Sequence, residues 1–197
     1  MFAKHTEALR LIATNLNREK IEWALGGSAM LTAYDLCPQA NDLDILVTAQ
    51  DAERAHEIVK LLGTHSEKAS KEPYCTVYFT HYRFASTTVD MLGLFGIHHE
   101  EGTYWLDWRP EKNDRIVRLS GDIDVPLASL EDWYTLYSLI PGKMERAEGI
   151  ETYWKQSTGP DPDRLRKVLE RQLPGFLRTR IHQLIEEAGN VEEMSAL

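Results

Sequence analysis

The chain has 197 residues, of which 43% are hydrophobic and 27% are charged, and its formal net charge is −9. This length and composition fit a globular protein with one good core, or with one core plus a helical appendage. They exclude a membrane protein, because no apolar run approaches the roughly 18 residues of a membrane span. The acidic charge argues against tight binding to a nucleic-acid backbone, which depends on Lys and Arg.

The two cysteines, Cys37 and Cys75, are too few for a disulfide framework. We expect both to be reduced thiols, as is usual in the cytoplasm. The N-terminal segment is amphipathic and lacks the continuous apolar stretch of a secretory signal. The sequence therefore predicts a cytoplasmic protein with no membrane partner.

Strand and helix patterns alternate in the first part of the chain. Helical spacing of apolar residues and β-branched runs distinguish the two. The predicted elements are a helix with its apolar face on Leu9, Ile12, Ala13 and Leu16, a strand over 21–25, a short helix over 28–35, a strand over 43–47, a helix with its stripe over 55–62, strands over 74–80 and 84–95, and an edge strand over 116–119. We expect a turn at residues 81–83 and an aromatic loop over 100–113.

From Ser129 onward the apolar spacing becomes helical throughout. Breaks are predicted at Pro141-Gly142, Gly159-Pro160 and Pro174-Gly175, and Asp161 followed by Pro162 is typical of a helix start. The predicted fold class is α/β (α+β). A mixed sheet flanked by helices would occupy residues 1–128, and residues 129–197 would form a helical region packed on it.

The most informative motif is the turn Gly26-Gly27-Ser28, followed by Asp42 and Asp44 on the next predicted strand. Residues two apart in a strand point to the same face, so these carboxylates would lie side by side and repel each other unless a cation binds between them. Mg²⁺ prefers oxygen ligands, often carboxylates plus substrate phosphates. The turn offers close backbone approach, free N–H groups and a hydroxyl. The pattern therefore predicts a site for a metal and a phosphate.

These residues resemble the signature of the nucleotidyltransferase superfamily related to DNA polymerase beta. That signature is a hydrophobic residue before Gly-Gly/Ser, about a dozen residues, then Asp-hydrophobic-Asp/Glu, then a third carboxylate on a later strand. Asp90 is the third carboxylate here, so the resemblance spans residues 21–92. Residues 125–150 are similar to the helical segment of small bacterial members, including antibiotic-modifying and toxin-type enzymes.

Four positions depart from the pattern of those small members. Tyr137 stands where a Lys usually falls, and Lys143 stands where an Arg falls. Pro38 and Ala40 replace the Arg and Thr that often precede the Asp pair. The metal-site residues themselves match the signature.

The resemblance implies a nucleotidyltransferase that moves a nucleoside monophosphate from a nucleoside triphosphate, ATP among them, to an acceptor hydroxyl with release of pyrophosphate. Asp42, Asp44 and Asp90 would be catalytic and would hold two Mg²⁺ ions. The nucleotide phosphates would contact Gly26, Gly27, Ser28 and Lys143.

Each of these residues also has a simpler interpretation. Asp42, Asp44 and Asp90 could be solvated acids on strands, Ser28 a helix cap, and Lys143 a water-facing charge. Four other features carry no firm functional assignment. They are the aromatic residues Tyr104, Trp105 and Trp108 (a lid on the sheet or a pocket lining), the run His98–Glu101 (a metal site or, preferred, a solvated loop), Asp122 and Asp124 (a second Asp-x-Asp motif or, preferred, a surface loop), and Arg146 (a phosphate ligand or a solvated charge).

Three functions remain open on the sequence. The acidic chain suits a small cationic acceptor, such as an antibiotic hydroxyl, better than RNA or a protein. A toxin-type enzyme that modifies transfer RNA or a protein is the second alternative. The third is a catalytically inactive module that binds a nucleotide or a partner. The oligomeric state is also open, and a homodimer is one of the states allowed.

Overall fold

The computed structural model describes residues 4–67 and 70–195. The chain divides into two compact units, Met1–Phe95 with Leu106–Ser129, and Gly96–Trp105 with Leu130–Leu197. The domain ranges 1–128 and 129–197 stay a prediction. No helix among the described residues is both long enough and apolar enough to cross a membrane.

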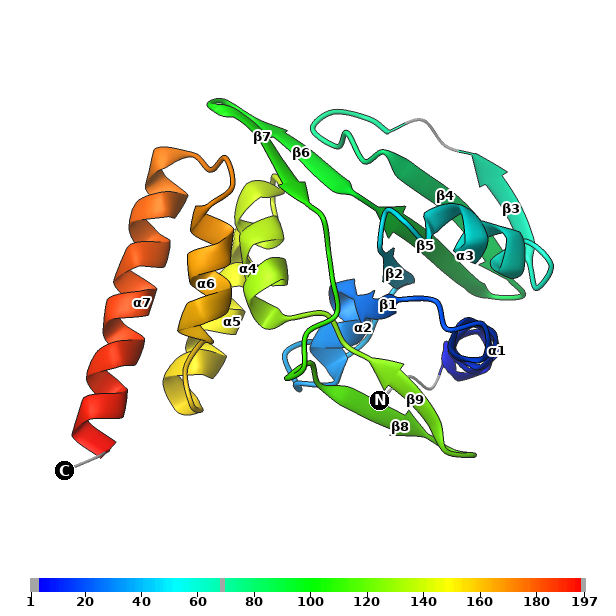
Figure 1. Ribbon diagram of the computed structural model, residues 1–197, viewed down its shortest axis with the longest axis horizontal. Helices are drawn as coiled ribbons and strands as arrows, with labels where there is room; N and C mark the ends of the chain where they lie inside the picture. The colour runs from blue at the N-terminus through cyan, green and yellow to red at the C-terminus, as the bar shows by residue number, and fades with distance from the viewer. Residues whose placement is uncertain (1–3, 68–69, 196–197) are drawn as a thin grey trace. The chain divides into compact units, whose positions relative to one another are not determined.

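A five-stranded mixed sheet forms the centre of the first unit (Figure 1). Its strands, in spatial order, are β1 (Trp23–Gly26), β2 (Leu43–Val47), β5 (Thr87–Gly93), β4 (Tyr78–Phe84) and β3 (Thr64–Glu67). β2 and β5 are parallel, and the other neighbours are antiparallel. This mixed sheet with flanking helices confirms the predicted fold class.

Three helices and a hairpin complete this unit: α1 (Thr6–Arg18), α2 (Gly27–Thr32), α3 (Ala52–Val59), β8 (Ile116–Leu119) and β9 (Ile123–Pro126). The predicted apolar face of α1 is fully buried. Helix α3 covers one face of the sheet, where His56 Nδ1 lies 2.7 Å from the hydroxyl of the buried Tyr82. Side chains alternate along a strand, so His81 and Arg83 project from the other face.

The predicted turn at 81–83 is wrong, because these residues belong to β4. The turn between β4 and β5 instead falls at Ala85-Ser86, where Ala85 has a φ of +49°. Polar His81 and Arg83 suggested a loop, but each alternates with a buried aromatic residue, Tyr82 and Phe84. Residues 74–77 precede the strand that was predicted to start at Tyr74.

The second unit contains α4 (Leu130–Leu139), α5 (Met144–Gln156), α6 (Pro162–Leu169) and α7 (Gly175–Ser195), together with most of a hairpin, β6 (Phe95–His99) and β7 (Gly102–Leu106). The predicted N-cap is confirmed, since the Asp161 side chain accepts hydrogen bonds from the backbone N–H groups of Asp163 and Arg164. Helix α7 continues beyond the predicted end near residue 188.

The predicted loop over 100–113 is partly wrong, because its first residues form the turn and second strand of the β6–β7 hairpin. The hairpin tip contacts the start of α7. Glu101 Oε1 accepts a hydrogen bond of 2.7 Å from Gly175 N, and the Glu101 carbonyl accepts one of 2.7 Å from Gln172 Nε2. The N-terminus of a helix has backbone N–H groups that need acceptors. For α7, Glu101 is such an acceptor, although it is distant in the sequence.

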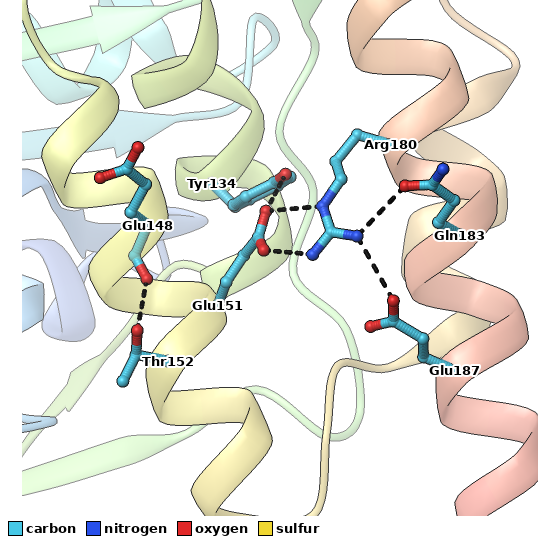
Figure 2. Close-up of polar contacts among 7 residues, drawn as sticks. All are labelled: Tyr134, Glu148, Glu151, Thr152, Arg180, Gln183 and Glu187. Atoms are coloured by element: carbon cyan, nitrogen blue, oxygen red, sulfur yellow. Dashed lines mark hydrogen bonds and ion pairs between the residues drawn. The ribbon is translucent and has the colours of Figure 1, made fainter.

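A charged network joins three helices of this unit (Figure 2). Glu151 on α5 accepts hydrogen bonds from the Tyr134 hydroxyl on α4 at 2.7 Å and from Arg180 Nε on α7 at 3.0 Å. Burial alone would raise the pKa of Glu151, but the hydrogen bonds from Arg180 and Tyr134 outweigh it and lower that pKa. Such charge-assisted, two-pronged contacts fix orientation as well as adding stability.

A second carboxylate of this unit, Glu131, is buried in α4 with only 7% of its surface exposed. Burial raises the pKa of Glu131, although its Oε1 accepts a hydrogen bond of 2.9 Å from Asp161 N. A raised pKa means that the proton binds more tightly in the folded state. This carboxyl therefore stabilises the fold below its unfolded pKa of about 4.5, and the contribution is lost as the pH rises through the folded pKa.

We expect Glu131→Gln to remove this pH dependence while keeping the oxygen that accepts from Asp161 N. The free energy of unfolding of the variant, minus that of the wild type, should rise between about pH 4 and about pH 7. Urea unfolding at each pH measures it, with the exposed Glu148→Gln on α5 as the control. A difference that does not change with pH would contradict the prediction.

Candidate active site

Four residues in register form a row across four neighbouring strands of the sheet. Gly26 on β1 is the register partner of Asp44 on β2, and Asp44 is the partner of Asp90 on β5. Asp90 is in turn the partner of His81 on β4. Register partners point to the same face of a sheet, so the two carboxylates and the imidazole share the face opposite Tyr82. We call Gly26, Asp44, Asp90 and His81 the polar row.

The Asp44 carboxylate lies directly against the Gly26-Gly27 turn. A Cβ atom added to Gly27 would lie 1.7 Å from Asp44 Oδ2, which is far inside van der Waals contact. Gly27 also has a φ of +59°, in the left-handed region that favours glycine. Glycine is therefore required here for both space and backbone conformation, and the predicted phosphate turn and carboxylate are in contact.

Asp42 and Ser28 lie close in the sequence to the two residues of this contact. Asp42 lies in the bend before β2 and, like Asp44, is partly exposed, whereas Leu43 and Ile45 are buried. This is the alternation that the sequence predicts. Ser28 is the second residue of α2 and is 3% exposed, and Gly26 rather than Ser28 occupies the N-cap position. Phosphate binding by Ser28 stays a prediction.

His81 is a member of the site that sequence reasoning missed. Its Nδ1 lies 2.5 Å from Asp90 Oδ1, and the two side chains are 16% and 26% exposed. With the Asp90 carboxylate ionised, His81 Nδ1 donates and Oδ1 accepts. The signal was the alternation His-Tyr-Arg-Phe, which places His81 on the open face once it is assigned to a strand.

Tyr74 is the second residue that sequence reasoning missed. Its ring stacks on Phe95 with a centroid distance of 6.2 Å. Burial raises the pKa of the Tyr74 hydroxyl, and the negative charge of Asp44 raises it further. About a third of this residue is open to solvent.

The remaining sequence candidates lie elsewhere in the fold. Lys143 is the N-cap residue of α5 in the helical unit, and its contact with a nucleotide stays a prediction. Arg146 donates a hydrogen bond of 3.2 Å to the Tyr137 hydroxyl and lies over that ring. Tyr104 is fully buried, and its hydroxyl accepts a hydrogen bond of 2.7 Å from Arg171. Asp124, predicted to lie in a surface loop, belongs to β9 and pairs with Arg118 at 2.8 Å.

The polar row suits a cation whose remaining ligands come from a bound substrate. Over residues 4–67 and 70–195, no three His, Cys, Asp or Glu side chains form a ready-made metal-binding group. Asp44 and Asp90 nevertheless present carboxylates on neighbouring strands in register. Mg²⁺ is commonly held by one or two carboxylates together with substrate phosphates, and this donor set fits that pattern.

Two comparisons with known proteins give no match, one with protein-family models and one with curated proteins. Solved structures do match. The candidate nucleotidyltransferase TM1012 from Thermotoga maritima superimposes with a TM-score of 0.58 at 24% identity, over 80% of this chain and 97% of that one. The crystal structure of ANT(2'')-Ia in complex with adenylyl-2''-tobramycin superimposes with a TM-score of 0.52 at 11% identity, over 91% of this chain and 98% of that one.

The solution structure of the antibiotic-resistance factor ANT(2'')-Ia gives the same TM-score, 0.52, over 96% of this chain and all of that one, at 11% identity. The chain therefore has the nucleotidyltransferase fold, as the Gly-Gly-Ser and Asp-Leu-Asp residues predicted.

Proposed function

We propose that this protein is a Mg²⁺-dependent nucleotidyltransferase, which transfers a nucleoside monophosphate from a nucleoside triphosphate to the hydroxyl of a small acceptor. The observation that supports this most is the contact between Asp44 and the Gly26-Gly27 turn, with Asp90 in register beside Asp44. Two carboxylates and a turn free of side chains are what a metal-bound triphosphate requires.

Positioning and charge neutralisation dominate this chemistry, so the residues act mainly by binding and orienting. The acceptor oxygen bonds to the α-phosphorus, the bond to the β-phosphate oxygen breaks, pyrophosphate leaves with the electron pair, and the hydroxyl proton is released. Asp42, Asp44 and Asp90 would hold the divalent cations. When bound, these supply positive charge that neutralises phosphate oxygens and lowers the pKa of the acceptor hydroxyl.

The backbone of Gly26 and Gly27 holds the terminal phosphates, since no Cβ at Gly27 separates the turn from the carboxylate side of the site. Ser28 is a further proposed phosphate contact. The partly exposed ring of Tyr74, whose hydroxyl pKa is raised by burial and by the charge of Asp44, is a further proposed contact, as a flat surface for the nucleotide. Flat rings of this kind stack with bases and sugars.

The proposed acceptor is a small cationic molecule. The formal charge of −9 favours such a ligand electrostatically over a polyanion. The adenylylated tobramycin of the ANT(2'')-Ia complex shows that an enzyme of the same fold uses a small-molecule acceptor.

The test is calorimetric titration of nonhydrolysable analogues of the four nucleoside triphosphates, each with Mg²⁺ and with EDTA. We expect binding of a preferred base in Mg²⁺ and a loss of at least about tenfold in EDTA, because the carboxylates repel an unneutralised triphosphate. Equal binding in EDTA would contradict metal dependence. Absence of binding to all four analogues would favour a catalytically inactive partner-binding module instead.

A further inference from the structure

We propose that His81 is a positioning residue for the metal site: its imidazole fixes the Asp90 carboxylate so that Oδ2 faces the cation shared with Asp44. This inference rests on the proposed function and extends it to a side chain outside the sequence motif.

The geometry assigns separate roles to the two oxygens of Asp90. Oδ1 accepts the hydrogen bond from His81 Nδ1 at 2.5 Å, on the β4 side of the strand. Asp44 is the register partner on the other side, so Oδ2 is the Asp90 oxygen left for a cation between β2 and β5. Asp90 would therefore offer a cation one carboxylate oxygen, Oδ2.

The backbone holds this contact in place. His81 and Asp90 are paired in the ladder of β4 and β5, which continues through seven residue pairs from Tyr78–Gly93 to Phe84–Thr87. The neighbouring Tyr82 faces the opposite side, where its hydroxyl contacts His56. On one face of β4, Tyr82 contacts His56 of α3. On the other face, His81 contacts Asp90 in the candidate site.

Such an anchor is needed because like charges that face each other across a sheet repel and turn apart. A hydrogen bond to a carboxylate ligand lowers the cost of assembling the site, since the rotation about the Asp90 side chain is already restricted. Loss of an outer hydrogen-bond partner typically weakens metal binding by about 10- to 100-fold.

Two substitutions distinguish the contribution of the His81 hydrogen bond from that of the His81 ring. His81→Phe keeps a ring but removes the donor, whereas His81→Asn keeps a side-chain N–H close to the position of Nδ1. The measured quantity is the Kd for Mn²⁺ in the presence of a nonhydrolysable nucleoside triphosphate, followed by the electron paramagnetic resonance signal of free Mn²⁺. The control is His65→Phe on β3, whose ring contacts Tyr82 on the opposite face.

We expect the Kd for Mn²⁺ to rise about 10- to 100-fold in His81→Phe, and to stay within about threefold of the wild type in His81→Asn and His65→Phe. Equal Mn²⁺ affinity in the wild type and His81→Phe would overturn the role of His81 and leave the proposed function standing. Absence of Mn²⁺ binding in the wild type would overturn both.

A second measurement does not depend on whether the variants fold. The imidazole nitrogens of the wild-type protein, observed by ¹⁵N nuclear magnetic resonance, should show a protonated Nδ1 on His81 with a slowly exchanging proton. An unprotonated Nδ1 in the wild type would overturn the proposal, because His81 could not then donate to Asp90.

Discussion

Gly27→Ala is expected to abolish nucleotide binding and to lower the free energy of unfolding by about 3 kcal/mol. A non-glycine residue at a φ of +59° costs about 1–3 kcal/mol, and the new Cβ would lie 1.7 Å from Asp44 Oδ2. The clash can be relieved only if the Asp44 carboxylate or the turn moves, and either movement separates the two halves of the site. Urea unfolding and calorimetric titration of the nucleotide analogue measure both effects.

Gly149→Ala is the matched control. Gly149 lies within α5, and a Cβ added to it meets nothing within 4 Å. Alanine is about 0.5–1 kcal/mol more favourable than glycine inside a helix, so this variant should be slightly more stable and should bind nucleotide normally. If Gly27→Ala matched the wild type in both measurements, the turn would not be part of the site.

The carboxylate half of the site could be predicted because its determinants are local. Alternation along β2 places Asp44 on one face of the sheet, and a tight turn before a short helix is recognisable from Gly26-Gly27. The contact between Gly27 and Asp44 then follows from the antiparallel pairing of β1 with β2, which places Gly26 opposite Asp44. Sequence reasoning therefore found the segments that the structure brings together here.

His81 was missed as a site residue because the sequence predicted the turn between β4 and β5 a few residues too early. A turn at 81–83 places His81 in a loop, whereas a two-residue turn at Ala85-Ser86 places it opposite Asp90. Ala-Ser is not a typical hairpin pair, since the conformations of such turns favour Gly, Asn and Asp. In the structure Ala85 has a φ of +49°. The strand that ends at this turn, β4, buries Tyr82 and Phe84.

The β6–β7 hairpin was missed for a different reason. His98–Glu101 is polar, and polarity alone favoured a solvated loop. The structure uses Glu101 as the acceptor for Gly175 N, a partner 74 residues later in the chain. A helix N-terminus without an acidic residue in its first turn, as in α7, can be satisfied by any segment that packs against it, and sequence spacing does not specify which one.

Asp44→Asn is expected to remove the response of the protein to Mg²⁺ and nucleotide while raising the stability of the metal-free protein. Asp44 and Asp90 are register partners with like charge, and such pairs destabilise a sheet. Relief of about 1 kcal/mol corresponds to a rise in Tm of about 2–4 °C for a chain of this size. Thermal unfolding in EDTA measures this rise.

The same thermal experiment, repeated with Mg²⁺ and a nonhydrolysable nucleoside triphosphate, separates function from structure. A ligand that binds only the folded state raises Tm with concentration, so the wild type should gain stability and Asp44→Asn should not. Asp124→Asn serves as the control because Asp124 pairs with Arg118 on the exposed β8–β9 hairpin. It should keep the ligand response with little change in Tm. A fall in Tm for Asp44→Asn in EDTA would instead make Asp44 a structural partner of the Gly26-Gly27 turn, since the fold would then need its charge without any metal.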